Sequence, residues 1–288
     1  MSQISEKYTE ERFFDFLILG SGIAGLTCAL QLAKRGRVAI VTKKQKAESN
    51  TNYAQGGIAA VTSQEDSFEK HVQDTCKAGA GLCREEVVRT IVSEGPERIA
   101  SLIALGLSFS EREIPDSGGA REWDLGKEGG HSKRRILHCK DMTGKVIEQA
   151  LLTAIAEDPN IEVLEDHFAI DLITSEKASL PGESHCLGAY VLNVLTGKVE
   201  AIGSSFVILA TGGCGKVYLY TTNPDIATGD GVAMAARSGV PIANMEFIQF
   251  HPTCLFHPKA KTFLITEALR GEGGILKDLD GLPFMKAY

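Results

Sequence analysis

The pattern of hydrophobic and polar residues near the start of the chain predicts a strand, then a helix, then a second strand. Phe13–Leu19 is apolar except for Asp15, which favours a fully buried strand. Apolar residues then recur at helical spacing over Ile23–Arg35, and Arg37–Thr42 (RVAIVT) forms a second short apolar run. This order predicts a β-α-β unit whose two strands are parallel.

The apolar stretch from Phe13 to Ala33, taken alone, suggests a signal peptide or a membrane span. However, the residues before it are polar and lean acidic, Asp15 lies inside it, and three closely spaced glycines interrupt it. A buried strand, turn and helix explain these residues better, and we therefore expect no membrane partner.

Farther along, the pattern predicts a mixture of helices, strands and loops. Helices are expected within 64–105, over Lys145–Ala156 and over Gly229–Gly239. Strands are expected within Ile161–Ile173, over Gly188–Val194 and Val199–Ile202 as a hairpin around Thr196-Gly197, and over Phe206–Ala210 as a further buried strand. Loops are expected over 43–62, over 106–140 and from Val240 onward, and residues 276–288 resemble the middle of a hairpin.

The composition is that of a globular protein without a strong electrostatic bias. The 288 residues are 43% hydrophobic and 23% charged, and a formal net charge of -7 without a basic cluster argues against nucleic acid as a partner. Thirty glycines gather in short runs beside apolar segments, which suggests close backbone approach to a ligand. The seven cysteines are odd in number and include no C-x-x-C pair, so we expect buried, reduced thiols in a cytoplasmic protein and no metal site.

A glycine motif lies between the first predicted strand and helix. The segment Gly20-Ser21-Gly22-Ile23-Ala24-Gly25 matches the pattern G-x-G-x-x-G. In this context the first two glycines permit a tight turn and close approach of a pyrophosphate, and the third lets the helix pack closely on the strand. The helix N-terminus then offers N–H groups to the phosphate. The alternative is a glycine turn that serves packing alone.

The end of the second predicted strand lacks the acidic residue with which dinucleotide-binding units usually bind ribose hydroxyls. Thr42-Lys43-Lys44 stands there instead, and Glu48 lies too far along, which weakens an NAD interpretation. Either a lysine here contacts a nucleotide through its backbone or its charge, or Lys43 and Lys44 are solvated surface residues.

Five further motifs combine glycine or proline with polar residues. They are Ser49–Gly57 (SNTNYAQGG), Ala210–Gly213 (ATGG), Thr228–Gly231 (TGDG), Glu246–Thr253 (EFIQFHPT) and Thr266–Gly274 (TEALRGEGG). The first offers hydroxyls, amides and paired glycines to a flavin edge or a phosphate, but a polar loop with turn glycines explains it equally simply. Asp230 either caps a helix or binds a cofactor hydroxyl. A single histidine such as His251 is more often structural than catalytic.

These motifs, together with GSGIAGL, EGGHSKRRILH and ATGGCGKVY, follow one another along nearly the whole chain. Their order resembles the succinate dehydrogenase/fumarate reductase flavoprotein superfamily, and within it the L-aspartate oxidase family. The resemblance implies an α/β fold, with a Rossmann-type FAD-binding domain over 1–240 and the start of an α+β capping domain over 241–288. It also implies four-carbon dicarboxylates as substrates.

The resemblance implies two sets of site residues. For FAD they are Gly20, Ser21, Gly22, Ile23, Ala24 and Gly25 at the pyrophosphate, Lys43 at the adenosine side, Asn50, Thr51, Asn52, Tyr53, Ala54, Gln55, Gly56 and Gly57 around the flavin, Phe168 and Ala169 at the adenine end, and Asp230. For the substrate they are His251, Thr266 and Glu267 at the carboxylates and Glu128 at the amino group of aspartate.

Two positions favour the aspartate-oxidising branch of the superfamily. Asn50 stands where succinate-handling relatives commonly carry the histidine that links FAD covalently, so the resemblance implies noncovalent FAD. Glu128 stands where those relatives usually carry an apolar residue, and a carboxylate there can pair with an ammonium group. Soluble fumarate reductases also bind FAD noncovalently, so Asn50 alone does not decide between the branches.

The resemblance thus implies FAD-dependent oxidation of L-aspartate to iminosuccinate, with oxygen or fumarate as electron acceptor. That reaction belongs to de novo NAD biosynthesis and implies a functional link to quinolinate synthase. The family's catalytic arginine lies beyond the equivalent of Tyr288, and Arg270 stands at a different family position, so we expect an incomplete chain. The alternatives are a fumarate reductase or succinate dehydrogenase flavoprotein, and a catalytically inactive FAD-binding fragment.

Overall fold

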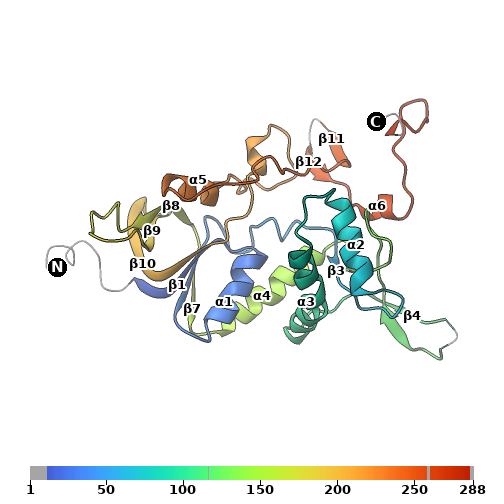
Figure 1. Ribbon diagram of the computed structural model, residues 1–288, viewed down its shortest axis with the longest axis horizontal. Helices are drawn as coiled ribbons and strands as arrows, with labels where there is room; N and C mark the ends of the chain where they lie inside the picture. Colours follow the sequence, from blue (N-terminus) through green and yellow to red (C-terminus); the bar gives the residue numbers. More distant parts are fainter. Residues whose placement is uncertain (1–11, 116, 258–259, 286–288) are drawn as a thin grey trace. The chain divides into compact units, whose positions relative to one another are not determined.

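The predicted β-α-β unit forms the middle of a six-stranded sheet in the computed structural model, which describes residues 12–115, 117–257 and 260–285 (Figure 1). The unit consists of β1 (Phe13–Leu19), α1 (Ile23–Leu32) and β2 (Val38–Val41). β1 and β2 are parallel, as predicted, with Leu19 opposite Val41. All of β2 and four of the seven residues of β1 are buried, which accounts for the predominance of apolar residues in both strands.

Around this unit the sheet is mixed, with the strand order β7-β2-β1-β10-β9-β8. The other four strands are β7 (Ile161–Leu164), β8 (His167–Thr174), β9 (Cys186–Asn193) and β10 (Lys198–Leu209). β7 runs parallel to β2 and β10 runs parallel to β1, whereas β8, β9 and β10 form an antiparallel meander. The turn between β9 and β10 contains Gly197 at φ +68, which confirms the predicted hairpin.

One long strand replaces the two that the sequence suggested within 199–210. β10 continues without a break because Gly203 pairs with Gly188 of β9 on one side and with Phe13 of β1 on the other. The first half of β10 therefore pairs with β9, and its second half pairs with β1. The predicted burial of its last residues was also wrong, since Phe206 is 62% exposed.

Helices cover both faces of the sheet. On one face the buried core joins all six strands to Met234 of α5 (Asp230–Arg237), so this helix packs there. The core residues are Phe14, Leu17, Leu19, Ala39, Val41, Leu164, Leu172, Ala189, Val191, Ile202 and Met234. On the opposite face, Ile18 lies against Gly25 of α1, as the alternation of side chains along a strand requires.

The chain divides into two compact units. The first comprises Met1–Tyr53 and Ile147–His251 and holds the six-stranded sheet, and the second comprises Ala54–Val146 and Pro252–Tyr288. These boundaries differ from the predicted one at residue 240, because the strands within 54–146 pair among themselves rather than with the large sheet. The assignment of FAD binding to 1–240 and of a capping domain to 241–288 stays a prediction.

The second unit consists of helices and two-stranded sheets. Its helices are α2 (Phe68–Ala78), α3 (Glu85–Ala104) and α6 (Ala268–Gly271). Its paired strands are β3 (Ile58–Ala59) with β6 (Ile136–Leu137), β4 (Glu111–Glu113) with β5 (Arg121–Trp123), and β11 (Cys254–His257) with β12 (Ala260–Leu264). The segment predicted as helical over 64–105 is two helices, because Ala80 and Gly81 adopt positive φ of 49 and 88 after α2. The regions predicted as loops, over 43–62, over 106–140 and from Val240 onward, contain the short strands named above.

Two further predictions concern the tail and the cysteines. Lys277 bridges antiparallel to Pro283, as the expected hairpin requires. The prediction that the seven cysteines are buried was wrong: five are half-buried, and Cys186 and Cys254 are exposed. They lie on helix flanks, in loops and at strand ends rather than in the core.

Among the described residues, no helix is both long and apolar enough to span a bilayer.

The last long helix, α4 (Thr143–Glu157), confirms the helix expected over Lys145–Ala156. Its apolar side chains Ile147, Leu151 and Ile155 are at most 3% exposed and recur every four residues, which gives the helix one buried stripe. Glu148, beside that stripe, is also buried, at 1% exposure.

Candidate cofactor site

The turn between β1 and α1 requires glycine at two positions. Gly20 has φ +117, and a Cβ there would lie 2.2 Å from the carbonyl oxygen of Ala210. A Cβ at Gly25 would lie 2.1 Å from the carbonyl oxygen of Gly20. Any side chain at either position would therefore push the helix, the turn and the end of β10 apart.

The N-terminus of α1 is capped from a distant loop. Gly22 occupies the cap position without a side chain, and the hydroxyl of Thr51 accepts a hydrogen bond from the Ile23 N–H at 3.0 Å. Ser21 donates its hydroxyl hydrogen to Thr42 Oγ1 at 2.9 Å, which ties the turn to the end of β2. The remaining first-turn N–H groups have no intrahelical partner and can serve an anion.

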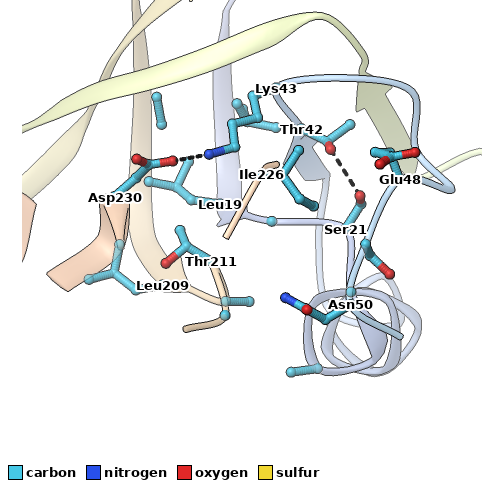
Figure 2. A pocket seen from close by; sticks show the side chains of 18 of the residues that line it. Leu19, Ser21, Thr42, Lys43, Glu48, Asn50, Leu209, Thr211, Ile226 and Asp230 are labelled. Atoms are coloured by element: carbon cyan, nitrogen blue, oxygen red, sulfur yellow. Dashed lines mark hydrogen bonds and ion pairs between the residues drawn. The ribbon is translucent and has the colours of Figure 1, made fainter. Parts of the chain in front are cut away.

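A cavity of about 370 Å³ opens beside this turn, within the first unit (Figure 2). It lies where β1, β2 and β10 end, which is where α/β sheets bind ligands. The predicted cofactor residues that line it are Gly20, Ser21, Gly22, Ile23, Ala24, Lys43, Asn50, Thr51, Phe168, Ala169 and Asp230. Four segments far apart in the sequence thus meet at one site.

Lys43 and Asp230 point toward each other in this cavity (Figure 2). Lys43 Nζ lies 2.5 Å from Asp230 Oδ2 and donates to Thr228 Oγ1 at 2.7 Å, and it lies 5.6 Å from the ring centroid of Phe168. The alternative that Lys43 is a solvated surface residue is therefore wrong, whereas Lys44 is exposed.

Asp230 does not cap α5. Gly229, at φ +78, holds the cap position, and Asp230 is the first residue of the helix. Its Oδ1 accepts a hydrogen bond from the hydroxyl of Thr228 at 2.7 Å. A carboxylate in the first turn also suits the helix dipole.

Several predicted cofactor residues lie outside this cavity. Gly25 serves helix packing, while Asn52 and Tyr53 belong to the first unit without lining the cavity. Burial and the neighbouring Glu48 carboxylate raise the pKa of Tyr53. The segment 54–57 belongs to the second unit, where a Cβ at Gly57 would lie 2.3 Å from the carbonyl oxygen of Leu137.

Other cavity residues carried no assigned role in the sequence. Thr211 belongs to the ATGG motif, and its Oγ1 accepts from the Gly231 N–H at 3.1 Å, which fixes the start of α5. No sequence motif pointed to His167 as a cavity residue. Its Nδ1 lies 2.6 Å from the carbonyl oxygen of Glu165, which fixes the tautomer with hydrogen on Nδ1. Thr42, Glu48, Ser49, Ile226 and Met234 complete the lining together with residues of β1, β2 and β10.

Three of the four predicted substrate residues belong to the second unit. Glu267 Oε1 accepts from the Gly129 N–H at 3.2 Å and lies 3.5 Å from the Arg270 guanidinium. Glu128 Oε1 would lie 3.2 Å from a Cβ at Gly56. The Glu128 loop, the TEALRGEGG segment and the paired glycines of SNTNYAQGG therefore lie together.

For the other two predicted substrate residues, Thr266 and His251, the structure gives fewer contacts. Thr266 is half-buried and lies two residues before α6, and its hydroxyl accepts a hydrogen bond at 3.4 Å from the N–H of Ala268, the first residue of that helix. His251 is half-buried in the first unit, whereas Thr266 belongs to the second.

A buried charge cluster holds the loop that carries Glu128. Arg135 is fully buried and forms hydrogen bonds to both carboxylate oxygens of Asp66, at 2.7 and 2.9 Å, and to Asp74 at 2.8 Å. His71 and His131 lie beside it with ring centroids 5.6 Å apart. Burial, followed by the positive charge of Arg135, lowers the pKa of both histidines. The sequence did not single out this cluster, because its members are spread over 66–135.

A parallel β-α-β unit with a glycine turn, an open helix N-terminus and a cavity at the strand ends defines a dinucleotide-binding domain. Residues 15–288 match the family described as FAD binding domain, and the chain belongs to that family. Its cofactor is accordingly FAD. The glycine cradle, the α1 N-terminus and the polar atoms of Lys43 and Asp230 fit a pyrophosphate and the hydroxyls of a nucleotide.

Relatives that are similar in sequence are L-aspartate oxidases. L-aspartate oxidase 1 of Ralstonia nicotianae is 53% identical over 275 residues, which cover 96% of this chain and 51% of that protein. Chloroplastic L-aspartate oxidase 2-a of Nicotiana tabacum is 52% identical over 285 residues, which cover 96% of this chain and 43% of that protein. The chain thus spans about half the length of the curated relatives it matches.

A solved structure of similar fold is the quinol fumarate reductase of E. coli. It superposes with a TM-score of 0.84 at 35% sequence identity, and the match covers 96% of this chain and 45% of that one. The likeness to the succinate dehydrogenase/fumarate reductase flavoprotein fold that the sequence suggested is confirmed.

Proposed function

We propose that this chain is the FAD-binding part of an L-aspartate oxidase, which converts L-aspartate to iminosuccinate. The observation that carries the proposal is the position of Glu128. Its carboxylate lies against Gly56 of the SNTNYAQGG segment. The next residue, Gly129, donates its N–H to the carboxylate of Glu267. A carboxylate at that point can pair with the ammonium group of aspartate. The roughly 50% identity to L-aspartate oxidases supports the same substrate.

The residues of the first unit hold the cofactor in this proposal. The α1 N-terminus with Ser21 and Gly22 binds the pyrophosphate, and Asp230 accepts from a cofactor hydroxyl while Lys43 neutralises its charge. Phe168 and Ala169 contact the adenine end, and the segment beginning at Asn50 surrounds the flavin. When bound, FAD supplies the two-electron acceptor for the oxidation. Asn50 offers no imidazole for a covalent link, so the cofactor is held noncovalently.

Four residues that the resemblance assigns to the substrate orient it in this proposal. Thr266 and Glu267, together with His251, organise the carboxylate ends of aspartate, and Glu128 holds its ammonium group. Fixing both ends of a small substrate aligns the Cα–H bond that breaks and lowers the entropic part of the barrier. Arg270 stands at a different family position from the arginine that the resemblance assigns to catalysis, and its guanidinium lies 3.5 Å from Glu267.

The proposal extends to partners and location. Oxygen or fumarate accepts the electrons, and iminosuccinate passes to a quinolinate synthase in de novo NAD biosynthesis. The location we propose is the cytoplasm, as the odd number of cysteines without a C-x-x-C pair suggested. A fumarate reductase is the second candidate, because the E. coli quinol fumarate reductase superposes closely. The substrate of a fumarate reductase carries no ammonium group, so Glu128 would have no partner on the substrate.

Anaerobic reduction distinguishes the two candidates. The full natural polypeptide that carries residues 1–288 is loaded with FAD and mixed with L-aspartate or with succinate without oxygen. We expect aspartate to bleach the flavin absorbance and succinate to leave it unchanged. Bleaching by succinate but not by aspartate would overturn the proposal in favour of a succinate-handling enzyme. Bleaching by neither would leave only the FAD-binding part of it standing.

A further inference from the structure

A buried acid lies directly behind the loop that lines the cofactor cavity. Glu148 of α4 is 1% exposed, and Ser49, the first residue of the SNTNYAQGG segment, is 5% exposed. Ser49 donates its hydroxyl hydrogen to Glu148 Oε1 at 2.5 Å. Glu148 Oε2 is buried and has no hydrogen-bond partner among the described residues. The proposed roles of the cavity residues make no use of this carboxyl group.

The Ser49–Glu148 bond fixes one end of a short loop whose other end caps the phosphate-binding helix. Ser49 Oγ accepts from the Asn52 N–H at 3.3 Å, which closes the turn on itself. Thr51 accepts from the Ile23 N–H at 3.0 Å, within the first turn of α1. Asn50, between these two anchors, lines the cavity. A shift of Ser49 would therefore move both the cavity wall and the cap of α1.

The environment of Glu148 favours its neutral form. Burial raises the pKa of Glu148 to about 7, the hydrogen bond from Ser49 lowers it in part, and the negative charge of Glu48 raises it again. Tyr53 is the other titratable group that responds to Glu148, and its own pKa is raised, so it brings no positive charge. Within the part of the chain that the structure describes, the neighbours that shift the pKa of Glu148 are Ser49 and Glu48, and neither carries a positive charge.

We propose that Glu148 is a positioning residue for FAD, which in its neutral form holds Ser49 and thereby shapes the loop that lines the cavity. Ionisation would leave a buried carboxylate with a single hydrogen bond, which costs far more free energy than a buried neutral acid. The carboxylate can escape this cost only by drawing in water or turning away from Ser49, and either movement releases the loop. FAD affinity should therefore fall as the pH rises past neutrality.

The proposal rests on the FAD site proposed above but not on the oxidation of aspartate. It is tested in the full natural polypeptide by titrating the apoprotein with FAD and following flavin fluorescence from about pH 6 to about pH 9. The wild type is compared with Glu148→Gln, which keeps an oxygen acceptor for Ser49 and cannot ionise. Glu157→Gln is the matched control, because Glu157 lies on the same helix and is exposed.

The wild type and Glu157→Gln should lose up to about a hundredfold in FAD affinity across this range, because only the protonated fraction binds well and a group with a pKa of about 7 is almost wholly ionised at pH 9. Glu148→Gln should show a flat profile. A Glu148→Gln variant that keeps the wild-type slope, or a wild type without a slope, would overturn the proposal. Weak binding by Glu148→Gln at every pH would overturn it too, since it would make the carboxylate itself necessary. All readings are taken without aspartate, so a failure of the proposed oxidase activity would not affect them.

Discussion

Lys43 at the end of β2 and Asp230 at the start of α5 form an ion pair of 2.5 Å, although 187 residues separate them in the chain. The end of β2 carries no acid in the sequence, and α5 brings a carboxylate to that place. Each side chain is 22% exposed, so the pair lies at the rim of the cavity rather than in the core. Lys43 is thus the partner of an acceptor that comes from helix α5, far along the chain.

Lys43→Met is expected to weaken FAD binding about tenfold, because it removes a charge-assisted donor and leaves Asp230 without its counterion next to an anionic cofactor. Lys44→Met is the matched control, since Lys44 is adjacent and exposed. FAD titration of both variants measures the difference. Equal affinities would mean that the ion pair has no part in binding the cofactor.

FAD should leave the protein completely on acid precipitation, because Asn50 lacks the imidazole of a covalent link. The flavin absorbance of the supernatant is compared with that of the washed protein pellet. Flavin that stays with the pellet after washing would contradict noncovalent binding.

The sequence predicted the β-α-β unit and the glycine turn beside the cavity, because both depend on local signals. Buried parallel strands give continuous apolar runs, and the glycine turn has a fixed spacing. The division into units was not predictable in the same way. Residues 54–146 pair with one another through β3-β6 and β4-β5, and no local pattern shows which strands will pair over such distances.

The single long strand β10 was missed for a related reason. Gly203-Ser204-Ser205 looks like a break in the sequence, but Gly203 pairs on both sides and carries the strand from β9 to β1. The Ser49–Glu148 bond and the Arg135 cluster were missed because each joins residues far apart in the chain. A buried charged residue becomes recognisable only when the packing around it is known.

Arg135→Met should lower the free energy of unfolding of the protein by about 3–5 kcal/mol, because it leaves the carboxylates of Asp66 and Asp74 without their buried partner. Arg134→Met is the control. Arg134 is half exposed in its ion pair with Glu272, and exposed pairs contribute about 0–1 kcal/mol. Urea unfolding of the two variants gives both values. Similar losses from the two would show that the cluster does not stabilise the fold more than a surface pair.

His71 and His131 should make the protein less stable in acid. The pKa of each lies below that of a free histidine, because burial and the Arg135 charge oppose protonation. Their contribution to stability is therefore complete above about pH 6.5 and is lost as the pH falls through the lowered pKa. His131→Gln should lose less stability than the wild type on acidification, as measured by urea unfolding. His185→Gln, at an exposed histidine, should behave like the wild type.

Glu128 decides the substrate in the proposed function. Its carboxylate lies against Gly56, and the adjacent Gly129 N–H is bound by Glu267, so its loop is held from two sides. Glu128→Gln keeps the shape of the side chain and removes the charge. In the full natural polypeptide, kcat/KM for L-aspartate should fall about ten- to a hundredfold, since a hydrogen bond to a charged group contributes about 1.5–3 kcal/mol.

Fumarate reduction by the same variant should change far less, because fumarate has no ammonium group. Glu113→Gln, at an exposed carboxylate of β4, controls for a general effect of removing one negative charge from the second unit. Two outcomes would contradict the assignment. If aspartate and fumarate activities both stay near those of the wild type, Glu128 is a solvated loop residue. If both fall equally, Glu128 maintains the loop rather than recognising the ammonium group, and the preference for an aspartate oxidase over a succinate-handling enzyme would lose its main structural support.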